Sequence, residues 1–129
     1  MGDPPIHKKR ITVQSAKAKG RNLQQWLAQQ ISDLLDIPWG KDEMIASREM
    51  GQTGMDIRLL GDAKKRFPYS PECKWCESWA IPAWIEQAKS NQAKGTEWLL
   101  VVKKNHHQPI VIIDAKHFFE LLARLEKQR

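Results

Sequence analysis

Residues 47–76 read SREMGQTGMDIRLLGDAKKRFPYSPECKWC, and this stretch carries most of the chemistry that the chain offers. Residues 56–60 (DIRLL) have the composition of one short strand, and residues 71–76 (PECKWC) that of a second strand. Gly61 and Asp62 favour a turn after the first strand, and a basic loop follows them. The stretch therefore predicts a β-hairpin with a long connection.

The two predicted strands place acidic and basic side chains at defined positions. Side chains alternate between the two faces of a strand, so Glu72 and Lys74 share one face while Cys73 points the other way into the core. If the two strands pair, Asp56 lies beside Glu72. The hairpin thus brings two carboxylates and one ammonium group together.

Two neighbouring carboxylates repel each other, and without a cation one of them has its pKa raised. Mg2+ removes this conflict because it prefers carboxylates, carbonyl oxygens and water as ligands. The metal ligands predicted here are Asp56, Glu72 and the backbone carbonyl of Cys73. Lys74 would orient or help to deprotonate a water, or stabilise charge on a phosphate, which indicates hydrolysis of a phosphodiester. The plain alternative is a surface salt bridge between Lys74 and Glu72.

Asp56 followed by Glu72-x-Lys74 after a hairpin resembles the PD-(D/E)xK nuclease superfamily. The surrounding sequence is similar to small phage-type nucleases related to Holliday junction resolvases, and the resemblance spans roughly residues 20–125. The residues that carry this wider context are Ser47, Arg48, Met50, Gly51, Gly54, Gln87 and Ala88.

The resemblance implies an α/β fold with a mixed central β-sheet flanked by helices, in a restriction-endonuclease-like core. It implies a Mg2+-dependent DNA endonuclease, with Mn2+ able to substitute, acting on four-way junctions in DNA recombination as a homodimer. It also implies a phage or bacterial origin. Spare tryptophans for a dimer surface are Trp39, Trp75 and Trp79, which fit a Trp-rich core equally well.

One departure from the family concerns the first helix, where resolvase relatives often carry a metal-site Glu. The comparable positions here are Gln24 and Gln25, which bring no anionic ligand. The missing carboxylate is then expected from the following loop, where Glu43 is preferred to Glu49, with Asp42 as a further candidate. Gln87, on a later helix, is expected to position a phosphate or a water.

The composition suits one domain that binds a polyanion. The chain has 129 residues and a net charge of +6, which favours nucleic acid as the partner. No apolar run approaches the length of a membrane helix, and the first residues do not have the pattern of a secretory signal. We therefore expect a cytoplasmic protein with a flexible basic arm over residues 1–19 and a nuclease domain over residues 20–129.

Several cations are expected to contact DNA phosphates. Phe67 and Tyr69 follow Lys64, Lys65 and Arg66 in the sequence. We expect Phe67 to pack on the core rather than to stack on a base. The residues assigned to DNA contact are Lys8, Lys9 and Arg10 in the arm, Arg48 before the first strand, and Lys64, Lys65 and Arg66 in the loop between the strands.

The two cysteines, Cys73 and Cys76, have C-x-x-C spacing, which invites a zinc or a redox interpretation. The candidate extra zinc ligands are His106 and His107, and adjacent residues on a strand point to opposite faces. A redox motif belongs at a helix N-terminus rather than within a strand. Reduced structural thiols are the preferred interpretation.

The remaining elements complete an α/β pattern. Helices are predicted for residues 20–36, from residue 82 to about 94, and for residues 116–127, while residues 97–103 and 109–114 predict strands. Residues 36–54 are expected to be irregular. Alternation of this kind predicts a sheet covered by helices on both faces.

Three functions remain open. The first is a junction-resolving endonuclease, and the second is a nuclease of the same superfamily that acts on duplex ends, flaps or single strands. The third is a DNA-binding module without catalysis, which the missing helix-one Glu favours. An acid cluster beside phosphate argues against the third function, because without a metal it would repel DNA.

Overall fold

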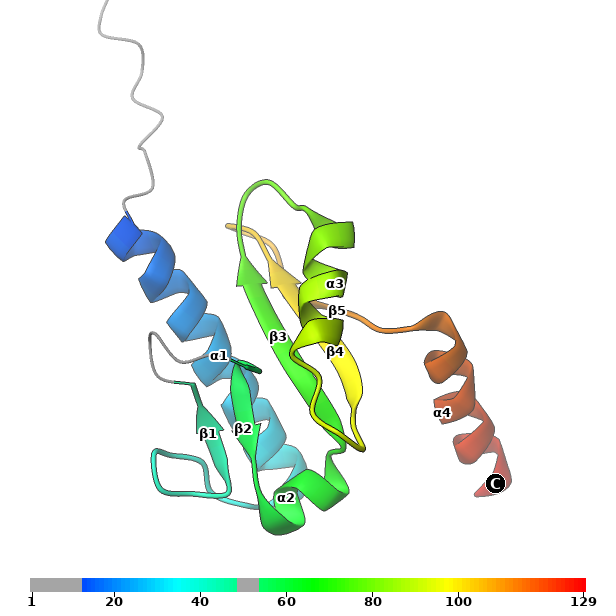
Figure 1. Cartoon of the computed structure of the whole chain (residues 1–129). Helices are drawn as coiled ribbons and strands as arrows, with labels where there is room; N and C mark the ends of the chain where they lie inside the picture. The colour runs from blue at the N-terminus through cyan, green and yellow to red at the C-terminus, as the bar shows by residue number, and fades with distance from the viewer. Residues whose placement is uncertain (1–12, 49–53) are drawn as a thin grey trace, which may run out of the picture.

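The computed structural model describes residues 13–48 and 54–129 of the chain. Its elements alternate between helices and short strands (Figure 1). In chain order they are α1 (Val13–Leu35), β1 (Ile45–Ser47), β2 (Ile57–Leu59), α2 (Gly61–Arg66), β3 (Tyr69–Trp75), α3 (Ile81–Ser90), β4 (Glu97–Lys103), β5 (Ile110–Ile112) and α4 (Ala115–Lys127).

The central sheet has the order β3-β4-β5. β3 and β4 are parallel over their whole length, from the pair Tyr69 and Glu97 to the pair Trp75 and Lys103. β5 is antiparallel to β4. The apolar run of β4 is buried on both faces, as the sequence predicts for residues 97–103, because helices cover both sides of the sheet.

Helices α1 and α3 cover opposite faces of this sheet (Figure 1). Cys73 and Val101 belong to the core that α1 closes, whereas Leu100 and Val102 belong to a second core under α3. The alternation of burial partners follows from the period of two along a strand. The α/β class and the mixed sheet flanked by helices are therefore confirmed.

The predicted hairpin is wrong in its pairing. β2 pairs with β1 in an antiparallel two-stranded sheet, with Ser47 opposite Ile57. β1 lies in a segment predicted to be irregular, because three residues between turn-forming sequences give no periodic signal. The predicted basic loop contains the helix α2, whose Ala63 is fully buried; one buried contact stabilises a turn of helix that the sequence pattern does not show.

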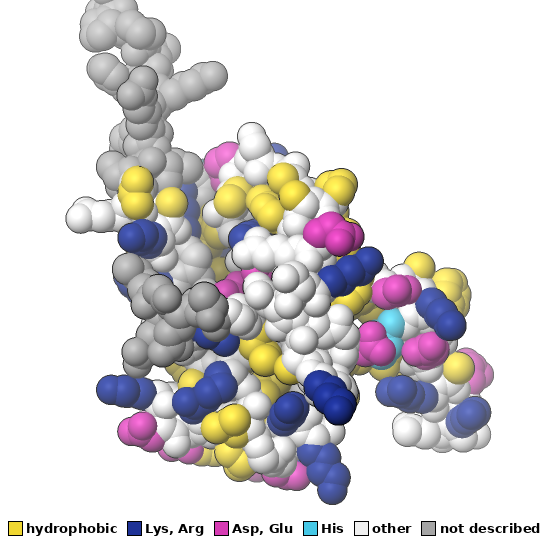
Figure 2. Space-filling view, viewed as in Figure 1, with side chains coloured by type: hydrophobic (Ala, Val, Ile, Leu, Met, Phe, Trp, Pro, Cys, Tyr) yellow, Lys and Arg dark blue, Asp and Glu magenta, His cyan; other side chains and the backbone are white. Residues whose placement is uncertain are grey.

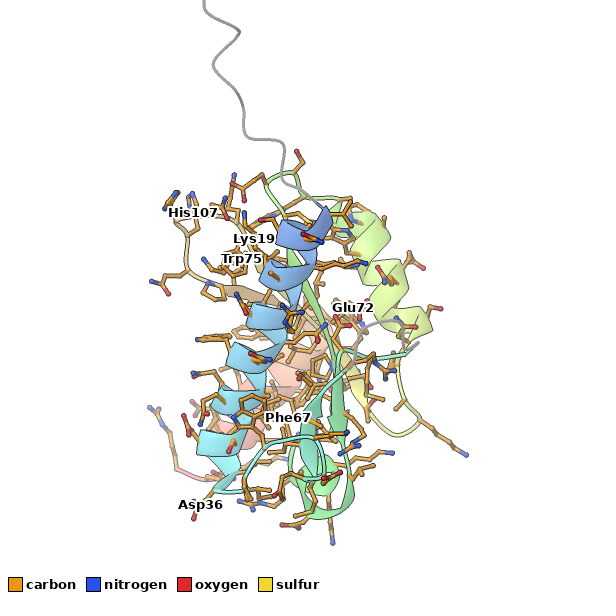
Figure 3. The ribbon with its side chains drawn as sticks, turned by 90° about the vertical axis from the view of Figure 1, so that its left-hand side faces the viewer. Lys19, Asp36, Phe67, Glu72, Trp75 and His107 are labelled. Carbon is orange, nitrogen blue, oxygen red and sulfur yellow. The ribbon has the colours of Figure 1, made fainter. Side chains whose placement is uncertain are left out.

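Helix α1 begins at Val13, seven residues before the predicted start at residue 20. Its first turns are mostly exposed, which explains the missing apolar periodicity. Lys19 fastens this part of the helix to the body, because its Nζ donates to Asn105 Oδ1 at 3.0 Å and lies 5.9 Å from the ring centre of Trp75 (Figure 3). The rest of the predicted arm, residues 1–12, lies outside the described residues.

Helix α4 stands beside the sheet and leaves much of its apolar side exposed (Figure 1). Its buried residue is His117, whose Nε2 lies 2.7 Å from the hydroxyl of Tyr69 at the start of β3. Within the described residues, no helix has the length and apolar character needed to cross a membrane.

Candidate active site

Asp56 is fixed against the edge of β3 by backbone contacts. Its N–H donates to the carbonyl of Pro71 at 3.0 Å, and its Oδ2 accepts a 2.7 Å hydrogen bond from the N–H of Cys73. Its own carbonyl accepts from the N–H of Arg48 at 2.8 Å. The β1–β2 sheet therefore holds Asp56 against β3, although β2 and β3 do not pair with each other as strands.

Glu72 directly precedes Cys73 on β3, and its side chain lies on the face of β3 that α3 covers. Its side chain is only 2% exposed, and Figure 3 shows it near the middle of the sheet. Its Oε2 is buried and has no hydrogen-bond partner among the described residues. A buried carboxylate oxygen without a donor is unfavourable, so this atom points to a missing cation or proton.

The carboxyl groups of Asp56 and Glu72 act on each other in opposite directions, because Asp56 raises the pKa of Glu72 whereas Glu72 lowers the pKa of Asp56. Burial, followed by the negative charge of Asp56, raises the pKa of Glu72 to about 7. Burial also raises the pKa of Asp56, and the Cys73 N–H and the Lys74 ammonium oppose that shift. Such a pair holds a proton that a divalent cation can replace.

Lys74 lies close enough to lower the pKa of both carboxyl groups. It shares a strand face with Glu72, as the sequence predicts, because the two residues are two positions apart on β3. The predicted trio of Asp56, Glu72 and Lys74 therefore comes together, by a route other than a simple hairpin.

The backbone of Cys73 contributes to the same edge. In a ladder, the N–H and C=O of one residue point to the same side of the strand, so the Cys73 carbonyl lies on the edge that faces Asp56. The Cys73 thiol points to the α1 core, and burial raises its pKa well above its usual range. Both Cys73 and Cys76 are free thiols.

Among the described residues, no three His, Cys, Asp or Glu side chains gather as metal ligands. The zinc interpretation of Cys73 and Cys76 with His106 and His107 therefore has no support in the structure. Two carboxylates and one carbonyl remain as the donor set beside Lys74. This is an oxygen set, which suits Mg2+ or Mn2+ better than zinc.

The preferred third acid, Glu43, is not at this place. Arg48 lies opposite Asp56 at one end of the β1–β2 sheet, while Glu43 precedes β1 at the other end. The whole of β1 lies between Glu43 and Arg48, so these two residues stand at opposite ends of that strand. Asp42 lies at that far end too, and Glu49 falls outside the described residues.

Asn91 is a residue that sequence reasoning missed. It caps the C-terminus of α3, and its side chain lies close enough to the Glu72 carboxyl group to lower the pKa of Glu72 in part. Gln87, one turn earlier, is exposed on the same helix, and its positioning role stays a prediction. The sequence signal that could have identified Asn91 is a polar residue at the C-terminus of a helix that packs on β3.

Arg48 borders the carboxylates, as expected for a phosphate contact. Its Nε donates to the carbonyl of Met55, and its charge lowers the pKa of Asp56. Gly54 has a φ of +102°, and a Cβ there would lie 2.8 Å from an Arg48 guanidinium nitrogen. Glycine at this position therefore keeps Arg48 in place.

The other predicted DNA contacts are dispersed. Lys64, Lys65 and Arg66 lie on α2 rather than on a loop, in the region where Lys and Arg side chains gather in Figure 2. Lys64 and Lys65 line a shallow depression together with Lys94, and Arg66 pairs with Asp62 at 3.4 Å. Phe67 packs against the core, as predicted. Lys8, Lys9 and Arg10 lie outside the described residues.

Comparison of the chain with models of protein families, with curated proteins and with solved structures finds no match.

Proposed function

We propose that this chain is a metal-dependent DNA endonuclease whose active site is formed by Asp56, Glu72 and Lys74. The observation that carries the proposal is the carboxylate pair, in which Glu72 is buried and Asp56 is half-buried. Glu72 has a raised pKa and an oxygen without a partner among the described residues, and a lysine lies beside both acids. Two neighbouring carboxylates withdrawn from water are unfavourable for stability unless a proton or a cation offsets their charge, which favours a functional role.

The donor set fits a hard divalent cation. Asp56, Glu72 and the carbonyl of Cys73 would hold Mg2+, with Mn2+ as a substitute. A bound ion would supply Lewis-acid activation of a phosphate oxygen and a lowered pKa for an attacking water. The free Oε2 of Glu72 is the atom that such an ion would satisfy.

Lys74 supplies the fixed positive charge of the site. Its ammonium group is oriented on the same strand face as Glu72, where it would hold a water by hydrogen bonding and stabilise negative charge that develops on the phosphate. The Cys73 N–H keeps Asp56 oriented, and the Asn91 side chain favours the ionised form of Glu72.

The order of elements is consistent with a restriction-endonuclease-like core, which is part of the proposal. An acid at the start of β2 and an E-x-K triplet on β3 are followed by a helix and a parallel strand. The helix-one positions Gln24 and Gln25 supply no carboxylate. The proposed site therefore works with two acids, one carbonyl and solvent.

Branched DNA is the proposed substrate, and a Holliday junction resolvase is the proposed activity. The charge of +6 favours a polyanion. Arg48 borders the site, and Lys64, Lys65 and Lys94 form a second basic area on the same chain. A resolvase needs two sites, so the proposal includes a homodimer.

The test is cleavage of a labelled four-way junction, a flap and a linear duplex of matched sequence, each with Mg2+ and with EDTA. The wild type is compared with Lys74→Ala and with Lys89→Ala, an exposed lysine on α3 paired with Glu86. Junction cutting that is lost in EDTA and in Lys74→Ala, but kept in Lys89→Ala, supports a resolvase.

Other outcomes redirect the assignment. Cutting of all three substrates keeps the site but indicates a general or end-directed nuclease. DNA binding without metal-dependent cutting of any substrate refutes the enzyme and leaves a binding module.

A further inference from the structure

A cavity of about 340 Å³ opens between the loop after α1 and the β1–β2 sheet. Its volume is of the order of a small-ligand pocket. The residues that matter for its chemistry are Trp39, Lys41, Ala46, Ser47, Arg48 and Arg58.

Arg58 is held in place by the backbone. Its guanidinium donates to the carbonyls of Lys41 at 3.2 Å and Glu43 at 2.6 Å. Its Nε is buried and has no partner within the described part of the chain. Ala46 lies directly opposite Arg58 across the strand pair, and its small side chain leaves the space open.

Trp39 supplies an aromatic wall whose indole is also fixed, because its Nε1 donates to Gln29 Oε1 at 2.8 Å. The described lining holds three cationic side chains, those of Lys41, Arg48 and Arg58, and no carboxylate. Cations beside an aromatic ring suit a phosphate joined to a planar base.

The cavity adjoins the carboxylate pair through Arg48. The Arg48 N–H donates to the Asp56 carbonyl at 2.8 Å, and its charge acts on the Asp56 carboxyl group. A strand with one phosphate at Asp56 and Glu72 therefore has its neighbouring nucleotide within reach of this cavity.

We infer that the cavity binds one unpaired nucleotide of the DNA strand next to the cleaved phosphate. The phosphate lies against Lys41 and Arg48, and the base lies against Trp39. This inference rests on the proposed nuclease function and sharpens its substrate class: strands that can be splayed, at a junction or a flap, fit the cavity, whereas a continuous duplex does not.

The test follows the indole NMR signal of Trp39, assigned with Trp39→Phe, while dAMP, deoxyribose 5-phosphate or inorganic phosphate is added in EDTA. We expect dAMP to shift the signal at lower concentration than the two probes that lack a base. Lys41→Gln is expected to weaken dAMP binding about tenfold, the loss typical of a hydrogen bond to a charged group. Ala46→Leu fills the space and should abolish binding, whereas Lys89→Gln on α3 should leave it unchanged.

Two results would overturn the inference: a Trp39 signal that dAMP does not move, or equal shifts in wild type, Lys41→Gln and Ala46→Leu. Because the titration needs neither metal nor cleavage, its outcome is separate from that of the nuclease assay. Binding of dAMP by a chain that cuts no DNA would keep the cavity and refute the enzyme.

Discussion

The N–H of Cys73 donates a 2.7 Å hydrogen bond to Oδ2 of Asp56, and this contact joins the two sheets of the protein at the candidate active site. It orients the Asp56 carboxylate along the edge of β3 without the help of a shared strand ladder. Because the donor is a backbone group, substitution of the Cys73 side chain leaves it in place. The positions of the two carboxylates therefore depend on the backbone as much as on the side chains.

Glu72→Gln should change how stability depends on pH. The pKa of Glu72 is raised from 4.5 to about 7, so between these values the folded protein keeps a proton that the unfolded chain releases. Stability of the metal-free wild type therefore falls as pH rises through this window, and the raised pKa of Asp56 acts in the same direction.

Thermal unfolding in EDTA at pH 5 and pH 8 checks this prediction. Glu72→Gln should unfold at a higher temperature than the wild type at pH 8 and near the wild-type temperature at pH 5. Glu86→Gln, an exposed acid on α3, is the matched control and should follow the wild type. Parallel pH profiles for wild type and Glu72→Gln would contradict the raised pKa.

Mg2+ and Mn2+ should stabilise the wild type, and more strongly at pH 8 than at pH 6. The ion binds the ionised carboxylates, which Glu72 presents fully only above its pKa of about 7. At a concentration a hundred times the Kd, binding raises the free energy of unfolding by about 2.7 kcal/mol. Thermal unfolding with and without metal measures the gain, which Asp56→Asn and Glu72→Gln should both abolish. An equal gain in these variants would place the ion elsewhere.

Much of this site could be predicted from the sequence, because residue spacing alone decides which side chains share a strand face. Glu72 and Lys74 follow that rule, and so does the inward-facing Cys73. The pairing of β2 could not be predicted, since its partner β1 is three residues long and lies between turns. Asn91 was hidden for a related reason: a helix end reaches β3 only through tertiary packing.

Gly54→Ala should disturb Arg48 and destabilise the fold. The positive φ of Gly54 disfavours any side chain, and the added Cβ would lie 2.8 Å from the Arg48 guanidinium. We expect a loss of at least about 1 kcal/mol in the free energy of unfolding, together with weaker DNA binding. Chemical denaturation and DNA titration measure the two effects. Gly20→Ala, in α1 where a Cβ meets nothing within 4 Å, should be neutral or stabilising.

Ser70→Ala should destabilise the protein without touching the candidate site. The Ser70 hydroxyl is buried, lies 2.6 Å from the Thr96 hydroxyl and accepts from the N–H of Ala93 at 2.9 Å. It therefore ties the start of β3 to the loop before β4. Removing it leaves the Ala93 N–H without this acceptor, which costs about 1–3 kcal/mol in the free energy of unfolding. Chemical denaturation measures the loss, and Ser90→Ala at the exposed end of α3 is the control.

Ser70 shares a strand face with Glu72, so the same variant also tests whether Ser70 positions the carboxylate pair. A loss of metal-dependent stabilisation in Ser70→Ala would show that it does, whereas unchanged metal binding would confine the role of Ser70 to the fold.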